Sequence, residues 1–251
     1  MKFKTVQIVK IGSQALFREK ERIDINKIND LGQDVKNLRD HKGVMSVLVT
    51  SGAISLGKMA RSMYDVADDV IGARVAASIG QLQLMELYKL SIGEEVAQIL
   101  PTHHSMLNAE NQRKFEEMMR ALINGGVFPI VNYNDTADDY EITHIIDFSD
   151  NDKLTQTLAL MLKVDRVIIL SNVDGLLDGD ERLIERVTLK DDFEKLRGFC
   201  GRKSSKGTGG MLSKINIAET LLKNGITMIL GNSKYSLQDI IDGKVPRTVF
   251  S

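Results

Sequence analysis

The sequence has few of the features that mark secreted, membrane-spanning or disulfide-bonded proteins. Cys200 is the only cysteine among 251 residues, so an internal disulfide is excluded and a reducing cytoplasm is expected. A catalytic Cys200 stays open, but an inert thiol is the preferred interpretation. No apolar run is long enough to cross a bilayer, and the N-terminus leads into a strand-like segment and not into a signal peptide. The sequence therefore predicts a cytoplasmic globular protein without a membrane partner.

An excess of charge of either sign is also missing. Lysine and arginine total 33 against 34 aspartates and glutamates, which gives a formal net charge of −1. Such a balance gives no indication of a nucleic-acid partner. Hydrophobic residues make up 43% of the chain and charged residues 27%, which is ordinary for a globular protein. The length suits one α/β domain or two small lobes.

Short apolar runs alternate with segments whose apolar residues recur at helical spacing. Strands are predicted at residues 6–11, 44–49, 96–100, 127–131, 166–170 and 226–230. Helices are predicted between Asp24 and Gly43, over 73–90, between Asn108 and Gly125, after Asp152 and from Met211 to Asn224. A hairpin is expected around residues 140–146, and 176–206 have no clear assignment. The alternation predicts an α/β fold, a mainly parallel sheet covered by helices on both faces.

The segments that follow the predicted strands are small, polar or rich in glycine. Ligands of parallel sheets bind beyond the carboxyl ends of the strands, so these segments are the first candidates for a site. They are Gly12-Ser13, Thr50-Ser51-Gly52-Ala53, Asn132-Tyr133-Asn134-Asp135 and Ser171-Asn172.

The most distinctive stretch is Gly207-Thr208-Gly209-Gly210-Met211-Leu212-Ser213-Lys214, directly before a helical apolar pattern. Free N–H groups at a helix start favour an anion, and Lys214 would slant back toward that start. The stretch predicts a phosphate cradle, with a flexible loop before a surface helix as the alternative. It is not a Walker P-loop, because Lys214 does not follow a glycine at the required spacing.

Other chemistries fit less well. The turn after the first strand has one glycine, Gly12, and lacks the dinucleotide-binding fingerprint. His103 and His104 are adjacent and cannot share a helix face, and no H-E-x-x-H motif occurs, which argues against a zinc hydrolase. The acidic residues around Asp150 and Asp152 could cap a helix or take part in catalysis. Lysines, backbone amides and carboxylates together are the set that phosphoryl transfer requires.

Six blocks of the sequence resemble the amino acid kinase family, in the family's order and over nearly the whole chain. They are Val9–Ser13, Val49–Ile54, Ala77–Gln81, Pro129–Asp135, Asp150–Asp152 and Gly207–Lys214. The Ser78-Ile79-Gly80-Gln81 and Gly207–Lys214 blocks point to the branch that phosphorylates the side-chain carboxylate of L-glutamate with ATP. The resemblance implies a three-layer αβα sandwich and the first step of proline biosynthesis.

The resemblance also implies roles for individual residues. Lys10 and Lys214 would hold the phosphates through the transition state, with Asp152 orienting both lysines. The residues expected to bind L-glutamate are Ser51, Gly52, Ala53, Asp135 and Asn151. Those expected to bind the nucleotide are Lys10, Gly12, Ser13, Ser171, Asn172, Thr208, Gly209, Gly210, Met211 and Lys214. ATP and Mg²⁺ are implied, with no protein residue assigned as a metal ligand.

At the level of the whole chain, the resemblance implies one amino acid kinase domain over residues 1–251. Its N-terminal part would bind the amino acid and its C-terminal part the nucleotide, with no C-terminal PUA domain. A homo-oligomer and feedback inhibition by proline are expected as well. Two alternatives stay open: a kinase of another small carboxylic acid or of a phosphate monoester, and a non-catalytic paralogue that binds an amino acid or a nucleotide.

Overall fold

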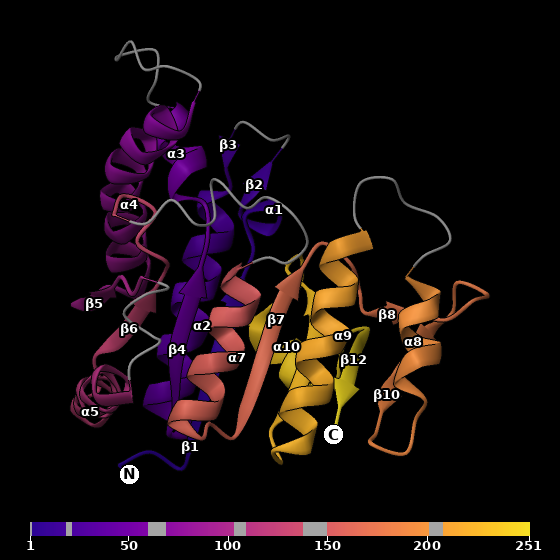
Figure 1. Cartoon of the computed structure of the whole chain (residues 1–251). Coiled ribbons are helices and arrows are strands. Elements are labelled where there is room, and N and C mark those ends of the chain that lie inside the picture. Colours follow the sequence, from indigo (N-terminus) through magenta and orange to yellow (C-terminus); the bar gives the residue numbers. More distant parts are fainter. Residues whose placement is uncertain (1, 19–21, 60–68, 103–108, 138–149, 201–207) are drawn as a thin grey trace.

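The computed structural model describes residues 2–18, 22–59, 69–102, 109–137, 150–200 and 208–251 (Figure 1). Its centre is an eight-stranded sheet in the order β10-β12-β11-β7-β1-β4-β6-β5. The strands are β1 (Thr5–Ile11), β4 (Val44–Thr50), β5 (Val96–Ile99), β6 (Phe128–Val131), β7 (Arg166–Ser171), β10 (Arg186–Val187), β11 (Thr227–Asn232) and β12 (Arg247–Phe250). Only β11 and β12 pair antiparallel in this sheet. The prediction of a mainly parallel sheet is confirmed.

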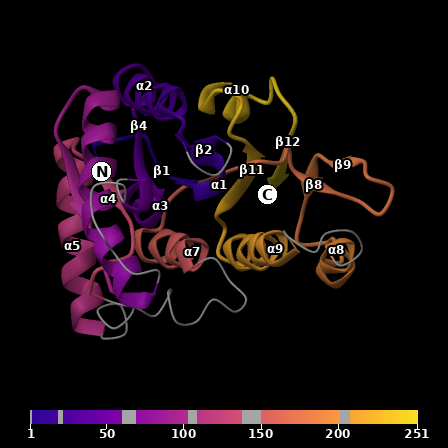
Figure 2. The ribbon, with the colours of Figure 1, turned by 90° about the horizontal axis from the view of Figure 1, so that it is seen from above.

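Two layers of helices cover the sheet, which Figure 2 shows from above. One face carries α2 (Ile25–Lys42), α4 (Val70–Ile92) and α10 (Leu237–Asp242), and both α4 and α10 pack against α2. The other carries α5 (Ala109–Gly125), α7 (Asp150–Leu162), α9 (Thr208–Lys223) and α8 (Phe193–Phe199). This confirms the predicted three-layer αβα sandwich.

The central strands are mostly apolar because helices cover them on both sides. All seven residues of β4 are buried, and so are the last six of β1. A strand buried on both faces shows no alternation of apolar and polar residues. This is why the sequence presents these strands as short continuous apolar runs.

Helix boundaries follow the local signals in the sequence. Asp24 caps α2, where its side chain accepts a hydrogen bond from the Lys27 amide at 3.4 Å. Gly43 ends α2 with φ of +66°, a conformation that glycine adopts without strain. Asp69 caps α4 in the same way as Asp24, through the Gly72 amide at 2.7 Å.

The short helix α3 (Ala53–Met59) lies directly against α4 because glycines remove the side chains between them. A Cβ atom at Gly80 would lie 1.9 Å from the carbonyl oxygen of Ala53. A Cβ atom at Gly57 would lie 1.8 Å from the carbonyl oxygen of Ala76. This contact fixes the turn between β4 and α3, which contains Ser51 and Gly52, against α4.

Several short elements are visible only in the structure. These are α1 (Ser13–Leu16), β2 (Phe17–Arg18), β3 (Arg22–Ile23), β8 (Leu176–Leu177), β9 (Leu183–Ile184), β10, α3, α8, α10 and β12. Elements of two to seven residues are too short to show a period, so residues 176–200 gave no assignment from sequence. The hairpin predicted around residues 140–146 lies outside the described residues. In the part of the chain that the structure describes, no helix is long and apolar enough to cross a membrane.

Candidate active site

The candidate site lies at the carboxyl ends of the parallel strands, where the sequence predicted it. In Figure 1 the N-termini of α7 and α9 reach the same end of the sheet as the tip of β7. The register aligns Ile11 at the end of β1 with Thr50 of β4 and with Leu170 of β7. The turns that follow these three strands are therefore neighbours in space.

A buried cluster of three charges, Lys10, Asp152 and Lys214, forms the centre of the site. The Lys10 Nζ atom lies 2.6 Å from Asp152 Oδ1, and the Lys214 Nζ atom lies 3.6 Å from Asp152 Oδ2. The Asp152 side chain is fully buried, and those of Lys10 and Lys214 are 5% and 12% exposed. The structure thus brings together three residues from β1, α7 and α9 that are far apart in the sequence.

The electrostatics of this cluster favour the binding of an anion. Burial lowers the pKa of Lys214, the charge of Lys10 lowers it further, and the Asp152 carboxylate opposes both effects. Two cations share one anion, so the cluster has an excess of one positive charge. An anion bound beside the lysines would offset the charge that burial leaves uncompensated.

Glycines and helix starts leave space around the two lysines. A Cβ atom at Gly12 would lie 3.4 Å from the Lys10 Nζ atom. Gly210 lies in the first turn of α9, and its carbonyl oxygen accepts a hydrogen bond of 2.8 Å from Lys214 Nζ. Lys214 therefore points back toward the N-terminus of its helix, as predicted from the direction of helical side chains.

The other predicted nucleotide residues lie in turns and helix starts at the same end of the sheet (Figure 1). Ser13 begins α1, directly after Gly12. Ser171 ends β7 and is aligned with Asn232 of β11, whose side-chain amide donates a hydrogen bond to the Asn172 carbonyl oxygen at 3.3 Å. Thr208, Gly209, Gly210 and Met211 form the start of α9.

Two of the predicted acceptor residues, Asn151 and Ser51, are in contact next to Asp152. The Asn151 side-chain amide donates hydrogen bonds to Ser51 Oγ at 2.7 Å and to Asn132 Oδ1 at 3.2 Å. Because Asn151 and Asp152 are adjacent in the first turn of α7, this turn joins the acceptor residues to the charged cluster. Asp135 is buried, 8% exposed, in the turn after β6.

Gly52 and Ala53 shape the acceptor turn by their backbone. Gly52 has φ of +110°, and a Cβ atom there would lie 2.9 Å from the ring of Phe17. Ala53 is buried and begins α3 against Gly80. Both residues therefore position Ser51, and their contact with a substrate stays a prediction.

Two polar residues of the site, Asn132 and Gln81, were given no role from the sequence, although Asn132 lies in one of the candidate segments that follow the strands. The Asn132 side-chain amide donates to Gln81 Oε1 at 3.0 Å, and both side chains are buried. Each lies in a block that resembles the amino acid kinase family, so a polar residue in an otherwise buried segment was the available signal. Tyr88 of α4 adds a buried hydrogen bond to Thr50 Oγ1 at 2.8 Å, one residue before Ser51.

A protein cage for a metal ion does not fit the described residues. They contain no group of three or more His, Cys, Asp or Glu side chains that could hold a metal ion. Asp152, the carboxylate at the centre, already has a lysine ammonium group near each oxygen. His103 and His104 lie outside the described residues.

Comparisons with known proteins agree with the fold and with the family resemblance. Residues 5–232 match the model of the amino acid kinase family. The glutamate 5-kinase of Clostridium perfringens is 32% identical over 255 residues, covering 97% of this chain and 94% of its own length. The glutamate 5-kinase of Lactococcus lactis is 32% identical over 253 residues, with 97% and 93% covered.

Solved structures with low sequence identity share the fold. The carbamate kinase of Giardia lamblia bound to AMP-PNP superimposes with a TM-score of 0.67 at 14% identity, over 99% of both chains. The UMP kinase of Ureaplasma parvum superimposes with a TM-score of 0.61 at 16% identity, over 98% of this chain and 99% of its own. The sequence blocks, the fold and the family match lead to one conclusion: this chain belongs to the amino acid kinase family.

Proposed function

We propose that this chain is an ATP-dependent kinase that converts L-glutamate to glutamyl 5-phosphate, the first step of proline biosynthesis. The observation that carries the proposal is the buried cluster of Lys10, Asp152 and Lys214 next to the polar acceptor residues Asn151 and Ser51. The names of the full-length relatives support glutamate as the acceptor.

The chemistry of this reaction matches a site of lysines without a general base. A glutamate side chain has a reference pKa of about 4.3, so the attacking carboxylate is already ionised at neutral pH. The protein has to bring two anions together in line and stabilise the negative charge that shifts between them. Lys10 and Lys214 supply positive charge for this purpose, and Asp152 holds both ammonium groups in place.

The nucleotide would bind over Gly12, Ser13, Ser171, Asn172 and the start of α9, which includes Thr208, Gly209, Gly210 and Met211. The acceptor would bind at Ser51, Gly52, Ala53, Asp135 and Asn151. Apart from Gly12 and Ser13, this division makes the N-terminal part of the chain the amino-acid-binding part and the C-terminal part the nucleotide-binding part. Mg²⁺ commonly keeps several waters and is bound through substrate phosphates, and we expect it to be held here by the phosphates of ATP.

The test is release of ADP by the purified protein across a panel of acceptors. The panel contains L-glutamate, L-aspartate, glutarate, carbamate and UMP, with Lys10→Ala as the inactive control. We expect turnover with L-glutamate and loss of most of it in the control. Turnover with another acceptor and none with L-glutamate would refute the glutamate assignment. No turnover with any acceptor, in a protein that binds nucleotide, would favour the non-catalytic paralogue.

The proposal also includes feedback inhibition by proline and assembly of the protein into a homo-oligomer. Proline should raise the apparent KM for L-glutamate and leave the KM for ATP little changed, if it competes at the acceptor residues. Size-exclusion chromatography with light scattering reads out the oligomeric state.

A further inference from the structure

We propose that Gln81, a buried residue of α4, is a positioning residue for the acceptor pocket. Its side-chain amide orients Asn132, and through Asn132 it orients Asn151 and Ser51. This inference rests on the proposed function, because it concerns how the acceptor residues of that kinase are held.

The argument starts from a continuous chain of hydrogen bonds, here called the amide chain, made of Gln81, Asn132, Asn151 and Ser51. Asn132 Nδ2 donates to Gln81 Oε1 at 3.0 Å, and Asn151 Nδ2 donates to Asn132 Oδ1 at 3.2 Å and to Ser51 Oγ at 2.7 Å. The amide chain connects α4, the end of β6, the first turn of α7 and the end of β4. Four elements that are separate in the sequence thus meet through side-chain amides.

Burial makes the orientation of each amide depend on its neighbour. Gln81, Asn132 and Asn151 are 7%, 2% and 5% exposed, so water is not a general substitute for their partners. If one amide turned over, a carbonyl oxygen would face another oxygen, or two N–H groups would face each other. The orientations of the three amides are therefore coupled. Gln81 is the member of the amide chain farthest from Ser51, and it fixes the orientation of that end.

Two members of the amide chain, Gln81 at one end and Asn151 next to Ser51, each have one buried atom without a partner among the described residues. These atoms are Gln81 Nε2 and Asn151 Oδ1. Unpaired buried polar atoms destabilise a folded protein, and natural proteins retain them mainly at functional sites. Asn151 is a predicted acceptor residue, so a polar group of a bound amino acid could pair with it.

A purely structural role does not explain the direction in which Gln81 reaches. Ser91, another buried polar residue of α4, donates to the Tyr88 carbonyl oxygen within its own helix at 3.0 Å. Gln81 instead makes its described hydrogen bond to a residue beyond the end of β6, next to the site. The amide chain also leaves Lys10 and Lys214 out, so its loss should affect the acceptor more than the nucleotide.

The first experiment compares Gln81→Met with wild type in steady-state kinetics. Methionine keeps the length of the side chain and removes both polar atoms, so Asn132 loses its partner while the unpaired Nε2 atom disappears as well. We expect a melting temperature close to that of wild type. The KM for L-glutamate should rise about tenfold, the usual scale for a lost buried hydrogen bond, with kcat and the KM for ATP little changed.

Ser91→Ala is the matched control, because it removes one buried hydrogen bond from the same helix outside the amide chain. It should leave the KM for L-glutamate unchanged. An unchanged KM in Gln81→Met, or an equal rise in the control, would overturn the inference.

A second experiment tests whether Gln81 acts through Asn151. In an Asn151→Ala background, Gln81→Met should raise the KM for the acceptor little further, because the residue through which it acts is gone. Full additivity would overturn the proposal. Side-chain amide NMR signals of Asn132 and Asn151 should also shift in Gln81→Met without any substrate, and unchanged signals would count against it.

The two proposals fail in different ways. Wild-type protein that turns over another acid and not L-glutamate refutes the glutamate assignment, and the KM comparison is then made with that acid. Wild-type protein that turns over L-glutamate, together with an unchanged KM in Gln81→Met, refutes only the role of Gln81.

Discussion

At the scale of the residue, Asp152 has two competing explanations that the structure separates. It lies in the first turn of α7, where an acidic residue favours the helix dipole. It is also fully buried between Lys10 and Lys214, which a helix-start role does not require. The ion pairs therefore make Asp152 the residue whose charge, and not only its shape, should matter.

Asp152→Asn tests this explanation, since asparagine keeps the shape and removes the charge. We expect kcat to fall by orders of magnitude, because the lysines lose the group that fixes their direction while phosphate charge is shifting. The melting temperature without nucleotide should also fall, because two buried cations are left without their anion. Lys153→Gln, at the exposed next position of α7, is the control and should keep both values. A kcat close to wild type would leave Asp152 with a structural role alone.

At the scale of the element, the close contact of α3 with α4 positions the acceptor turn. Gly80 lies where a Cβ atom would be 1.9 Å from the Ala53 carbonyl oxygen and 2.5 Å from the Gly57 amide nitrogen. Both neighbours are backbone atoms, which cannot give way as a flexible side chain can. A methyl group at this position would have to push α3 away from α4.

Gly80→Ala should therefore lower stability and weaken acceptor binding together. Overpacking typically costs about 1–3 kcal/mol, which corresponds to several degrees in melting temperature for a chain of this size. The KM for L-glutamate should rise, because Ser51 and Gly52 move with α3. Gly125→Ala is the control, since a Cβ atom there has no neighbour within 4 Å and alanine suits the last residue of α5. An unshifted melting temperature in Gly80→Ala would contradict the packing argument.

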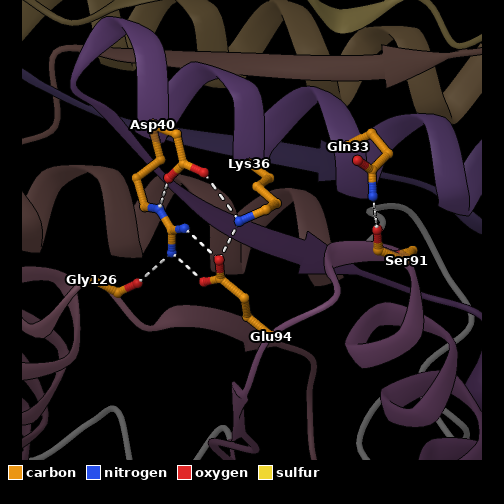
Figure 3. Close-up of polar contacts among 7 residues, drawn as sticks. Gln33, Lys36, Asp40, Ser91, Glu94 and Gly126 are labelled. Atoms are coloured by element: carbon orange, nitrogen blue, oxygen red, sulfur yellow. Dashed lines mark hydrogen bonds and ion pairs between the residues drawn. The ribbon is translucent and has the colours of Figure 1, made fainter.

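At the scale of the whole molecule, a charged cluster, drawn in Figure 3, ties three segments together. Its residues lie near the end of α2 and just before β5 and β6, and therefore at the end of the sheet opposite the candidate site. Arg39 of α2 donates to both carboxylate oxygens of Glu94, at 2.7 and 2.8 Å, and to the Gly126 carbonyl oxygen at 3.0 Å. Lys36 also donates to Glu94, and Arg39 stacks 4.7 Å from the centre of the buried Phe128 ring. The turns before β5 and β6 are thereby joined to α2.

This cluster predicts a specific dependence of stability on pH. Hydrogen bonds from Arg39 and Lys36 lower the pKa of Glu94 to about 2. A lowered folded-state pKa adds stability above the unfolded value of about 4.3, and the gain is lost as the pH falls toward 2. Because Glu94 is 37% exposed, solvent screening keeps the effect within about 1 kcal/mol.

Glu94→Gln is the corresponding test. Its melting temperature should lie about 1–3 °C below that of wild type at pH 7. This difference in melting temperature should become smaller as the pH falls from 5 to 3. The kcat should not change, because the cluster lies at the far end of the sheet. A gap that stays constant with pH would contradict the assignment to the Glu94 charge.

How far the sequence could predict this molecule depends on the range of the interaction. Apolar runs predicted β1, β4, β5, β6, β7 and β11 to within two residues at each end. A strand that is buried on both faces consists mostly of apolar residues, so it can be recognised from its own sequence. The two-residue strands β8, β9 and β10 have no such local signal. The antiparallel edge strand β12 depends on its pairing with β11 and was likewise missed.

The residues alone predicted the alternation of strands and helices and a candidate site at the strand ends, and the family resemblance predicted the lysines and carboxylates of that site. Which of these residues touch depends on the assembled fold, since the order of strands in the sheet sets the neighbours of each strand end. The fold placed Asp152 between Lys10 and Lys214 and linked Gln81 through Asn132 to Asn151. Periodicity reports that a residue is buried, whereas its hydrogen-bond partner comes from another element. For that reason the amide chain could be seen only once the sheet had been assembled.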